Sequence, residues 1–232
     1  MSLKEDLEKR VREIFQQRWT TRDGSVVPSD DSIKLNNDAV KLKATILYAD
    51  LADSTKLVDG YKDFFAAEVY KTFLHCAAKI ILSEGGTITA YDGDRIMAVY
   101  LGDSKNTSAV RTALKINWAA KNIVQKEMDD HYKERTTYKL YHVCGVDTSD
   151  IFVAKTGVRG ANDLVWVGKA PNYAAKLAAL DHTKATWITK AVYDQMDNSA
   201  KTASNGTNMW VANTWNDMGG KTIYSSTYWW SL

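Results

Sequence analysis

The chain has 232 residues, of which 45% are hydrophobic, enough for a real core in one large domain or two small ones. Thirty basic and 28 acidic residues leave a net charge of +2, so bulk charge indicates neither a nucleic acid nor a membrane as a partner. The two cysteines lack zinc-site spacing, and no apolar run suits a signal peptide or a membrane span. We therefore expect a cytoplasmic protein.

The N-terminal segment predicts a charged helix over residues 3–18 whose apolar face docks on the domain or on a second subunit. An irregular connector over 20–37 and a strand over 43–50 follow. The later elements are a helix over 60–83, a hairpin over 87–101, a helix over 105–130, a second hairpin over 138–155, a strand over 164–168, a helix opened by Pro171 and Asn172, a strand over 185–189, a helix over 190–196 and two tail strands near 209–211 and 221–227.

This order of elements, βαββαββ and then helix, strand and tail, predicts an α+β fold with a mixed sheet and helices on one sheet face. We expect residues 1–40 to form an N-terminal helix and connector. Residues 41–232 then form one catalytic domain. Its tail is rich in tryptophan, and such a cluster indicates core or interface packing; the residues are Trp210, Trp215, Trp229 and Trp230.

Two acidic residues are candidate metal ligands. An apolar run with β-branched residues leads directly into Asp50, and Asp94 lies at the tip of the hairpin over 87–101. If the hairpin flanks the first strand, both carboxylates meet at one sheet edge with the backbone carbonyl of Leu51. That donor set suits two Mg²⁺ or Mn²⁺ ions bridging a triphosphate. The alternative is that Asp92 and Asp94 are ordinary turn acids.

The segment after Asp50 adds a candidate phosphate site. Asp53, Ser54 and Thr55 follow as at a helix cap, where free backbone N–H groups attract anions. Together with the Gly93-Asp94 hairpin and the stretch from Gly168 through Asn172 to Lys176, this segment resembles the class III nucleotidyl cyclase catalytic domain over about residues 43–227.

The resemblance implies specific roles for these residues. Asp50, Leu51 and Asp94 would hold two metal ions, and Asp53 to Thr55 would bind phosphates. The nucleoside 3′-oxygen would attack the α-phosphorus, with pyrophosphate leaving in line. Asn172 would position the ribose, although helix capping is its alternative role.

Lys176 departs from the family pattern, which has arginine there. Lys176 can still neutralise charge on the α-phosphate, although it lacks the bidentate fork of arginine. Alternatively, the role of the arginine has moved to Arg159 or Arg95. Lys176 itself can also be a solvated surface residue. Lys221 resembles the family's tail lysine on the terminal phosphates.

The base pocket departs as well. Ala90 and Val165, with Trp166 beside the latter, stand where family members usually carry polar groups that read a purine. A pyrimidine fits better. The Trp19-x-x-Arg22-x-Gly24 connector and the sequence from Tyr48 to Thr55 resemble the bacterial Pycsar cyclases of antiphage defence. That resemblance implies UTP or CTP as substrate, with UTP favoured, and cyclic UMP or cyclic CMP as messenger.

The same resemblance implies a homodimer in which Asp50 and Asp94 of one subunit face Asn172 and Lys176 of the other. Three other functions stay open. These are an inactive nucleotide-binding module of this fold, an adenylate or guanylate cyclase, and a polymerase-like palm that makes linear or dinucleotide products.

Overall fold

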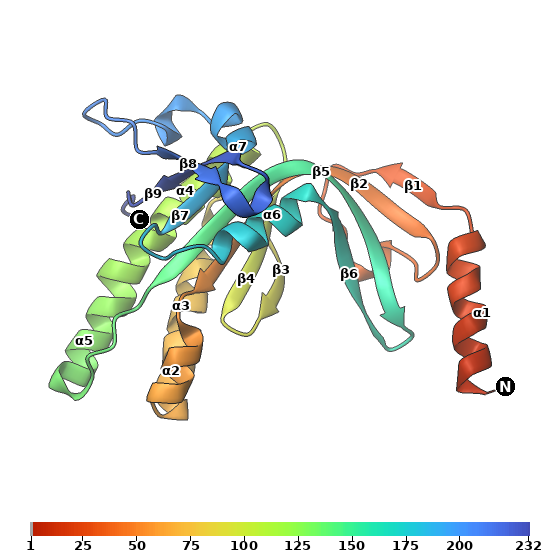
Figure 1. The fold of residues 1–232 in the computed structure, drawn as a ribbon, viewed down its shortest axis with the longest axis horizontal. Coiled ribbons are helices and arrows are strands. Elements are labelled where there is room, and N and C mark those ends of the chain that lie inside the picture. Colours follow the sequence, from red (N-terminus) through yellow and green to blue (C-terminus); the bar gives the residue numbers. More distant parts are fainter. Residues whose placement is uncertain (1) are drawn as a thin grey trace. The chain divides into compact units, whose positions relative to one another are not determined.

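The computed structural model describes residues 2–232, which form two compact units. The first comprises the residues before Ala44 together with Asp150–Gly168, and the second comprises Ala44–Ser149 with Lys169–Leu232 (Figure 1). The inclusion of residues 150–168 in the first unit is not evident from the sequence, and the domain boundary after residue 40 stays a prediction. Within residues 2–232, no helix is both long and apolar enough to cross a membrane.

The second unit is built on a mixed sheet with the strand order β3-β4-β2-β5-β7-β9-β8. Its first four strands have the order of a ferredoxin-like βαββαβ core, which confirms the predicted fold class. Strands β2 and β4 pair antiparallel, whereas β5 and β7 pair parallel. The strands are β2 (Asp38–Leu51), β3 (Thr87–Asp92), β4 (Arg95–Tyr100), β5 (His142–Val158), β7 (Thr186–Thr189), β8 (Val211–Trp215) and β9 (Lys221–Ser226).

Helices cover both faces of this sheet. Alternation along β5 points Cys144 and Val146 into a large core with α3 and α4, whereas Val143 faces a smaller core with Leu177 of α6 and Trp187. Helix α6 therefore lies on the opposite face, and the prediction that all helices share one face does not hold for it. The helices are α2 (Ser54–Gly60), α3 (Asp63–Ser83), α4 (Lys105–Ala119), α5 (Lys126–Tyr132), α6 (Lys169–Ala178) and α7 (Lys190–Gln195).

Gly145 explains how α6 comes so close to the sheet. A Cβ atom at this position would lie 2.1 Å from the carbonyl oxygen of Ala174 and 2.5 Å from the backbone nitrogen of Ala178. Only glycine leaves room for the helix backbone there.

The helix predicted over 105–130 is interrupted. Residues Ala120–Gln125 between α4 and α5 form a π-helical segment, a rare conformation that often occurs at functional sites. Residues 105–130 contain no glycine or proline that would have predicted this interruption.

Strand β5 corrects the prediction of a second hairpin around residues 147–150. It is one continuous strand, and residues around the predicted turn form hydrogen bonds inside the sheet. The Thr189 hydroxyl donates to Asp147 at 2.5 Å, and the Thr148 hydroxyl donates to the carbonyl of Ala44 at 3.2 Å. These partners are far away in sequence, so the local pattern resembles a turn.

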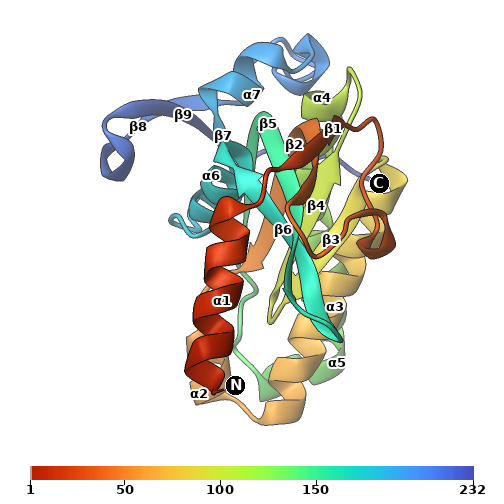
Figure 2. The same cartoon turned by 90° about the vertical axis from the view of Figure 1, so that its right-hand side faces the viewer.

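In the first unit, helix α1 (Leu3–Gln16) begins with a capping box formed by Ser2 and Glu5. Strand β1 (Thr20–Asp23), which pairs parallel with β2, replaces part of the predicted irregular connector. Strand β6 (Ala161–Gly168) forms a hairpin with the distal part of β5. The two views in Figures 1 and 2 follow the chain through these elements.

The apolar face of α1 is not covered within the described residues. No residue of this helix is buried, and Leu3 and Phe15 are 75% and 85% exposed. Docking of α1 on the domain or on a second subunit therefore stays a prediction. In the tail, Trp210 and Trp215 are buried, which confirms core packing for these two tryptophans.

Candidate functional site

Asp50 and Asp94 come together at one end of the β2–β4 pair. The strand register places Asp50 opposite Arg95, and Asp94 precedes Arg95 at the tight β3–β4 turn, where Gly93 adopts a positive φ of 62°. Burial and the neighbouring Asp94 raise the pKa of Asp50 to about 6. We call Asp50, Leu51 and Asp94 the acidic edge.

The acidic edge fits a divalent cation. The Oδ2 atom of Asp94 is buried and has no hydrogen-bond partner among residues 2–232. A buried carboxylate oxygen without a partner is costly, and a hard cation is its natural ligand. The described residues contain no cluster of three or more His, Cys, Asp or Glu side chains suited to a metal ion. The carbonyl of Leu51 and substrate oxygens would therefore have to complete the coordination.

Arg95 already has partners next to the acidic edge. Its guanidinium is 2.5 Å from the Asp92 carboxylate and lies over the Tyr48 ring, 5.4 Å from the ring centre. Its positive charge also offsets part of the effect of Asp94 on the pKa of Asp50. Arg95 therefore has a local counterion role, and Asp92 is its partner.

The turn after β2 is fixed by contacts that the sequence did not reveal. The Ala52 N–H donates to the carbonyl of Tyr141 at 2.9 Å. Asp53 adopts a left-handed conformation with a φ of 58°, and its carboxylate is 2.9 Å from the Lys56 Nζ and 3.9 Å from the His182 Nδ1.

These contacts limit what the turn can offer a phosphate. Asp53 is the N-cap residue of α2, which confirms the predicted helix start, but its side chain makes no capping bond. The N–H of Ala52 is engaged, which leaves the backbone of Asp53, Ser54 and Thr55 as the predicted phosphate site. His182 lies 129 positions after Asp53, and no sequence signal connects them.

A second group of predicted residues lies on α6 and β9. Asn172 is the fourth residue of α6, so helix capping is excluded for it. Asn172 and Lys176 are both exposed and one helical turn apart. The Lys176 Nζ is 3.4 Å from the Met218 Sδ, and the Lys221 Nζ donates to the Met218 carbonyl at 2.9 Å. We call Asn172, Lys176 and Lys221 the cationic edge.

The remaining predicted residues divide between the two units. Ala90 is exposed on β3 opposite Met97 in the second unit. Val165 and Trp166 lie on β6 in the first unit, and Arg159 is exposed at the turn between β5 and β6. A base pocket formed by Ala90, Val165 and Trp166, and a catalytic Arg159, stay predictions.

Comparison with known proteins gives close relatives. No family model matches the chain. The uridylate cyclase of Xanthomonas perforans is 51% identical over 233 residues, and that of Burkholderia cepacia is 50% identical over 234 residues. Each alignment covers 100% of both chains.

Solved structures agree on the fold. The adenylyl cyclase CyaB from P. aeruginosa superposes with a TM-score of 0.68 at 18% identity, covering 81% of this chain and 95% of that chain. This chain belongs to the uridylate cyclase family, and its fold is that of the class III nucleotidyl cyclases.

Proposed function

We propose that this chain converts UTP to 3′,5′-cyclic UMP and pyrophosphate. The observation that carries the proposal is the identity of 51% with a uridylate cyclase over the full length of both chains. The acidic edge supplies the matching chemistry, because nucleotide cyclisation needs a site that binds cations and a triphosphate together. Cyclic UMP would then act as a messenger in antiphage defence.

The acidic edge would hold two divalent ions, Mg²⁺ or Mn²⁺. The carboxylates of Asp50 and Asp94 and the carbonyl of Leu51 are the protein ligands in this proposal. Bound there, the ions would neutralise the phosphates and favour the 3′-oxygen as nucleophile. Support comes from the unpartnered oxygen of Asp94 and from the raised pKa of Asp50.

The cationic edge would act on the phosphates and the ribose. Lys176 would neutralise charge that develops on the α-phosphate, and Asn172 would orient the ribose from the same helix face. Lys221 would bind the terminal phosphates. Both lysine side chains make only weak or backbone contacts at Met218, so they are free to exchange these for phosphate oxygens.

We further propose a homodimer in which the acidic edge of one subunit meets the cationic edge of the other. No hydrogen bond or ion pair in the described part of the chain joins Asn172 or Lys176 to Asp50 or Asp94. The exposed apolar face of α1 supplies surface that a second copy would cover.

UTP is favoured over CTP by the names of the close relatives. Ala90 and Val165 carry no side-chain polar group, so neither side chain can hydrogen-bond to a purine. Incubation with each of the four nucleoside triphosphates and Mn²⁺, with products identified by mass spectrometry, tests the proposal. Cyclic UMP as the main product is expected. A product from ATP or GTP alone contradicts the base assignment.

The presence of Lys176 instead of arginine favours one other function, a domain that binds nucleotide without cyclising it. Calorimetry with a non-cleavable UTP analogue and Mg²⁺ separates the two. Binding without any turnover of the four nucleotides would identify the inactive module, whereas a linear or dinucleotide product would indicate polymerase-like chemistry.

A further inference from the structure

Tyr138, in the segment that precedes β5, carries a buried hydroxyl with no hydrogen-bond partner among residues 2–232. A buried tyrosine hydroxyl usually has a partner, because losing its water without one is costly. Tyr100 shows the ordinary case, since its buried hydroxyl donates to the Thr112 hydroxyl at 2.8 Å. Asp94 of the acidic edge has a buried oxygen in the same unpartnered condition. A donor and an acceptor in this unit are therefore both left open.

The ring of Tyr138 is held among aromatic side chains. Its centre lies 5.5 Å from that of Tyr61 and 5.8 Å from that of Phe65, and both contacts are edge-on. Tyr61 directly follows α2, the helix that begins at the predicted phosphate turn. Turning the hydroxyl toward solvent would disrupt these ring contacts, so its direction is fixed.

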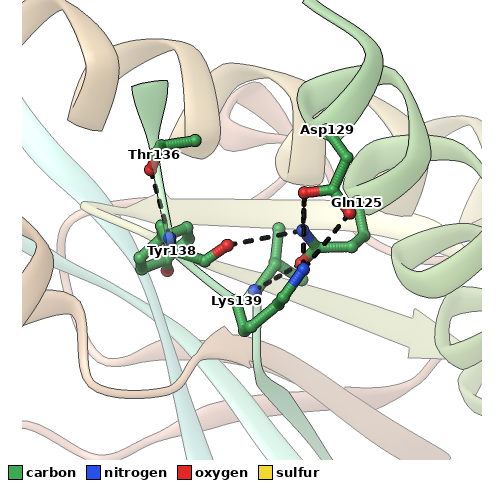
Figure 3. Close-up of polar contacts among 6 residues, drawn as sticks. Gln125, Asp129, Thr136, Tyr138 and Lys139 are labelled. Carbon is green, nitrogen blue, oxygen red and sulfur yellow. Dashed lines mark hydrogen bonds and ion pairs between the residues drawn. The ribbon is translucent and has the colours of Figure 1, made fainter. Parts of the chain in front are cut away.

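The backbone of Tyr138 is fixed as well (Figure 3). Its N–H donates to the Thr136 hydroxyl at 3.1 Å, and its carbonyl accepts from Gln125 at 3.4 Å. Gln125 also accepts from the Leu140 N–H at 2.8 Å and donates to Asp129 at 2.8 Å. Tyr138 is therefore held in place through both its ring and its backbone, as a binding residue needs to be.

The segment that carries Tyr138 leads to the turn after β2. The carbonyl of Tyr141 accepts the N–H of Ala52 at 2.9 Å. Tyr138 precedes Tyr141 by three residues, and three residues span at most about 11 Å. Tyr138 therefore cannot lie far from the turn that links the acidic edge to the predicted phosphate site.

The hydroxyl of Tyr138 lies within electrostatic reach of both parts of the candidate site. Burial raises the pKa of Tyr138 to about 12, and Tyr70, Tyr61, Asp53 and Asp94 contribute to the rise. The hydroxyl therefore keeps its proton at neutral pH and remains a donor. Since no described residue accepts from it, it is open to an acceptor that arrives with a ligand.

We propose that Tyr138 is a substrate-binding residue whose hydroxyl donates to a phosphate oxygen of the nucleoside triphosphate. A phosphate oxygen suits this donor, because hydrogen bonds to an ionised acceptor are about twice as strong as those between neutral groups. In the proposed function the triphosphate lies between the acidic edge and the phosphate turn, and Tyr138 is near both. The inference deepens the proposed cyclase function and rests on it.

Tyr138→Phe removes only the hydroxyl. By calorimetry in Mg²⁺, this variant should bind α,β-methylene-UTP, a non-cleavable analogue, about tenfold or more weakly than the wild type. Its KM for UTP should rise by a similar factor with kcat nearly unchanged, as expected when binding to the substrate itself is lost. Its thermal midpoint should not fall, because the hydroxyl has no partner in the free protein.

Three results would overturn the proposal. Equal binding of the analogue to the wild type and Tyr138→Phe is the first, and an unchanged KM for UTP is the second. The third is a lower thermal midpoint of Tyr138→Phe, which would show that the hydroxyl has a structural partner in the free protein.

Tyr100→Phe is the matched control. It removes a buried hydroxyl that has a partner, so it should lower the thermal midpoint and leave binding of the analogue unchanged. Equal weakening of analogue binding in Tyr100→Phe and Tyr138→Phe would overturn the assignment, because it would reflect a general loosening of the fold.

Mn²⁺ without nucleotide separates a phosphate oxygen from the water bound to a metal ion. Electron paramagnetic resonance should show equal affinity of the wild type and Tyr138→Phe for Mn²⁺. Weaker binding of Mn²⁺ by the variant would assign the hydroxyl to metal-bound water and would overturn the phosphate contact.

The binding measurements need no turnover, so failure of the two proposals can be told apart. If the wild type cyclises none of the four nucleotides but Tyr138→Phe binds the analogue about tenfold more weakly, the cyclase proposal fails and triphosphate binding by Tyr138 stands. If UTP is cyclised and the two proteins bind the analogue equally, only the inference about Tyr138 fails.

Discussion

The acidic edge and the cationic edge of the second unit differ in how complete they are. Asp50 and Asp94 are crowded and partly buried, with one carboxylate oxygen unpartnered, so this edge is electrostatically unfavourable without a cation. Asn172, Lys176 and Lys221 are exposed, and the two lysines make only easily exchanged contacts at Met218. The acidic edge therefore lacks a partner that a cation could supply, whereas the lysines of the cationic edge are accessible to solvent.

In the proposed function, the two edges are complementary half-sites. A metal-bound triphosphate would bring cations to the acids and oxygens to the lysines, so each edge would gain what it lacks only when substrate is present. Experiments that remove one edge at a time should therefore give different results for stability and for turnover.

The largest effect is expected from Asp94→Asn. Loss of a metal-ligating carboxylate should lower the rate of UTP cyclisation by at least about a hundredfold, more than the loss of an outer-shell partner usually costs. The thermal midpoint should not fall, because the like charge beside Asp50 is removed. Activity assays and thermal unfolding check both.

Asp103→Asn is the matched control, since Asp103 is an exposed acid in the loop before α4. It should retain activity. Equal loss of activity in both variants, or normal turnover by Asp94→Asn, would contradict the metal role of the acidic edge.

Mixing two inactive variants tests whether the edges meet across a dimer. Asp94→Asn and Asn172→Ala, combined in equal amounts and allowed to exchange subunits, should recover about a quarter of wild-type activity, since half the dimers then contain one intact site of two. No recovery, with subunit exchange confirmed by labelled chains, would place both edges of a working site in one subunit.

A smaller effect is expected from Lys176→Ala. Removal of a charge-assisted contact worth roughly 1.5–3 kcal/mol should lower kcat by about 10- to 100-fold with little change in stability. Lys176→Arg should restore most of the rate, because its guanidinium also binds phosphate. Lys79→Ala, at an exposed position of α3, serves as the control. Equal kcat values for Lys176→Ala and Lys79→Ala would assign Lys176 to solvated surface.

Each acid of the acidic edge was predictable from the sequence because it lies in a local pattern. An apolar run ends at Asp50, and a Gly-Asp turn carries Asp94, whereas the pairing of β2 with β4 that brings the two acids together was expected from the resemblance to the class III cyclases. The fold class followed from the order of the elements in the same way.

The parts that were missed depend on contacts distant in sequence. Residues Asp147 to Asp150 resemble a turn, but inside the sheet Thr189 donates a hydrogen bond to one Asp147 oxygen and Thr148 donates one to the Ala44 carbonyl. The contact of His182 with Asp53 leaves no local sequence pattern. The π-helical conformation of Ala120–Gln125 leaves none either. Gly145 shows the position of α6 only once Ala174 is known to lie against it.

The smallest effect we expect is a pH dependence of stability in metal-free protein. The folded state raises the pKa of Asp50 from 3.8 to about 6, so it binds more protons than the unfolded chain between these values. The stabilising contribution of Asp50 to the free energy of unfolding is therefore present below about pH 4 and is lost as the pH rises through about 6. Because Asp50 is partly exposed, the loss should be on the order of 1–2 kcal/mol.

Urea unfolding of the wild type and of Asp50→Asn, both in chelator, isolates this contribution from the other carboxylates. The difference between their free energies of unfolding should change with pH through this window and be flat at higher pH. Adding Mg²⁺ at neutral pH should stabilise the wild type and leave the variant less affected, because the cation offsets the repulsion between Asp50 and Asp94. Parallel pH profiles for the two proteins would mean that these acids are not crowded, and the contrast between the two edges would then disappear.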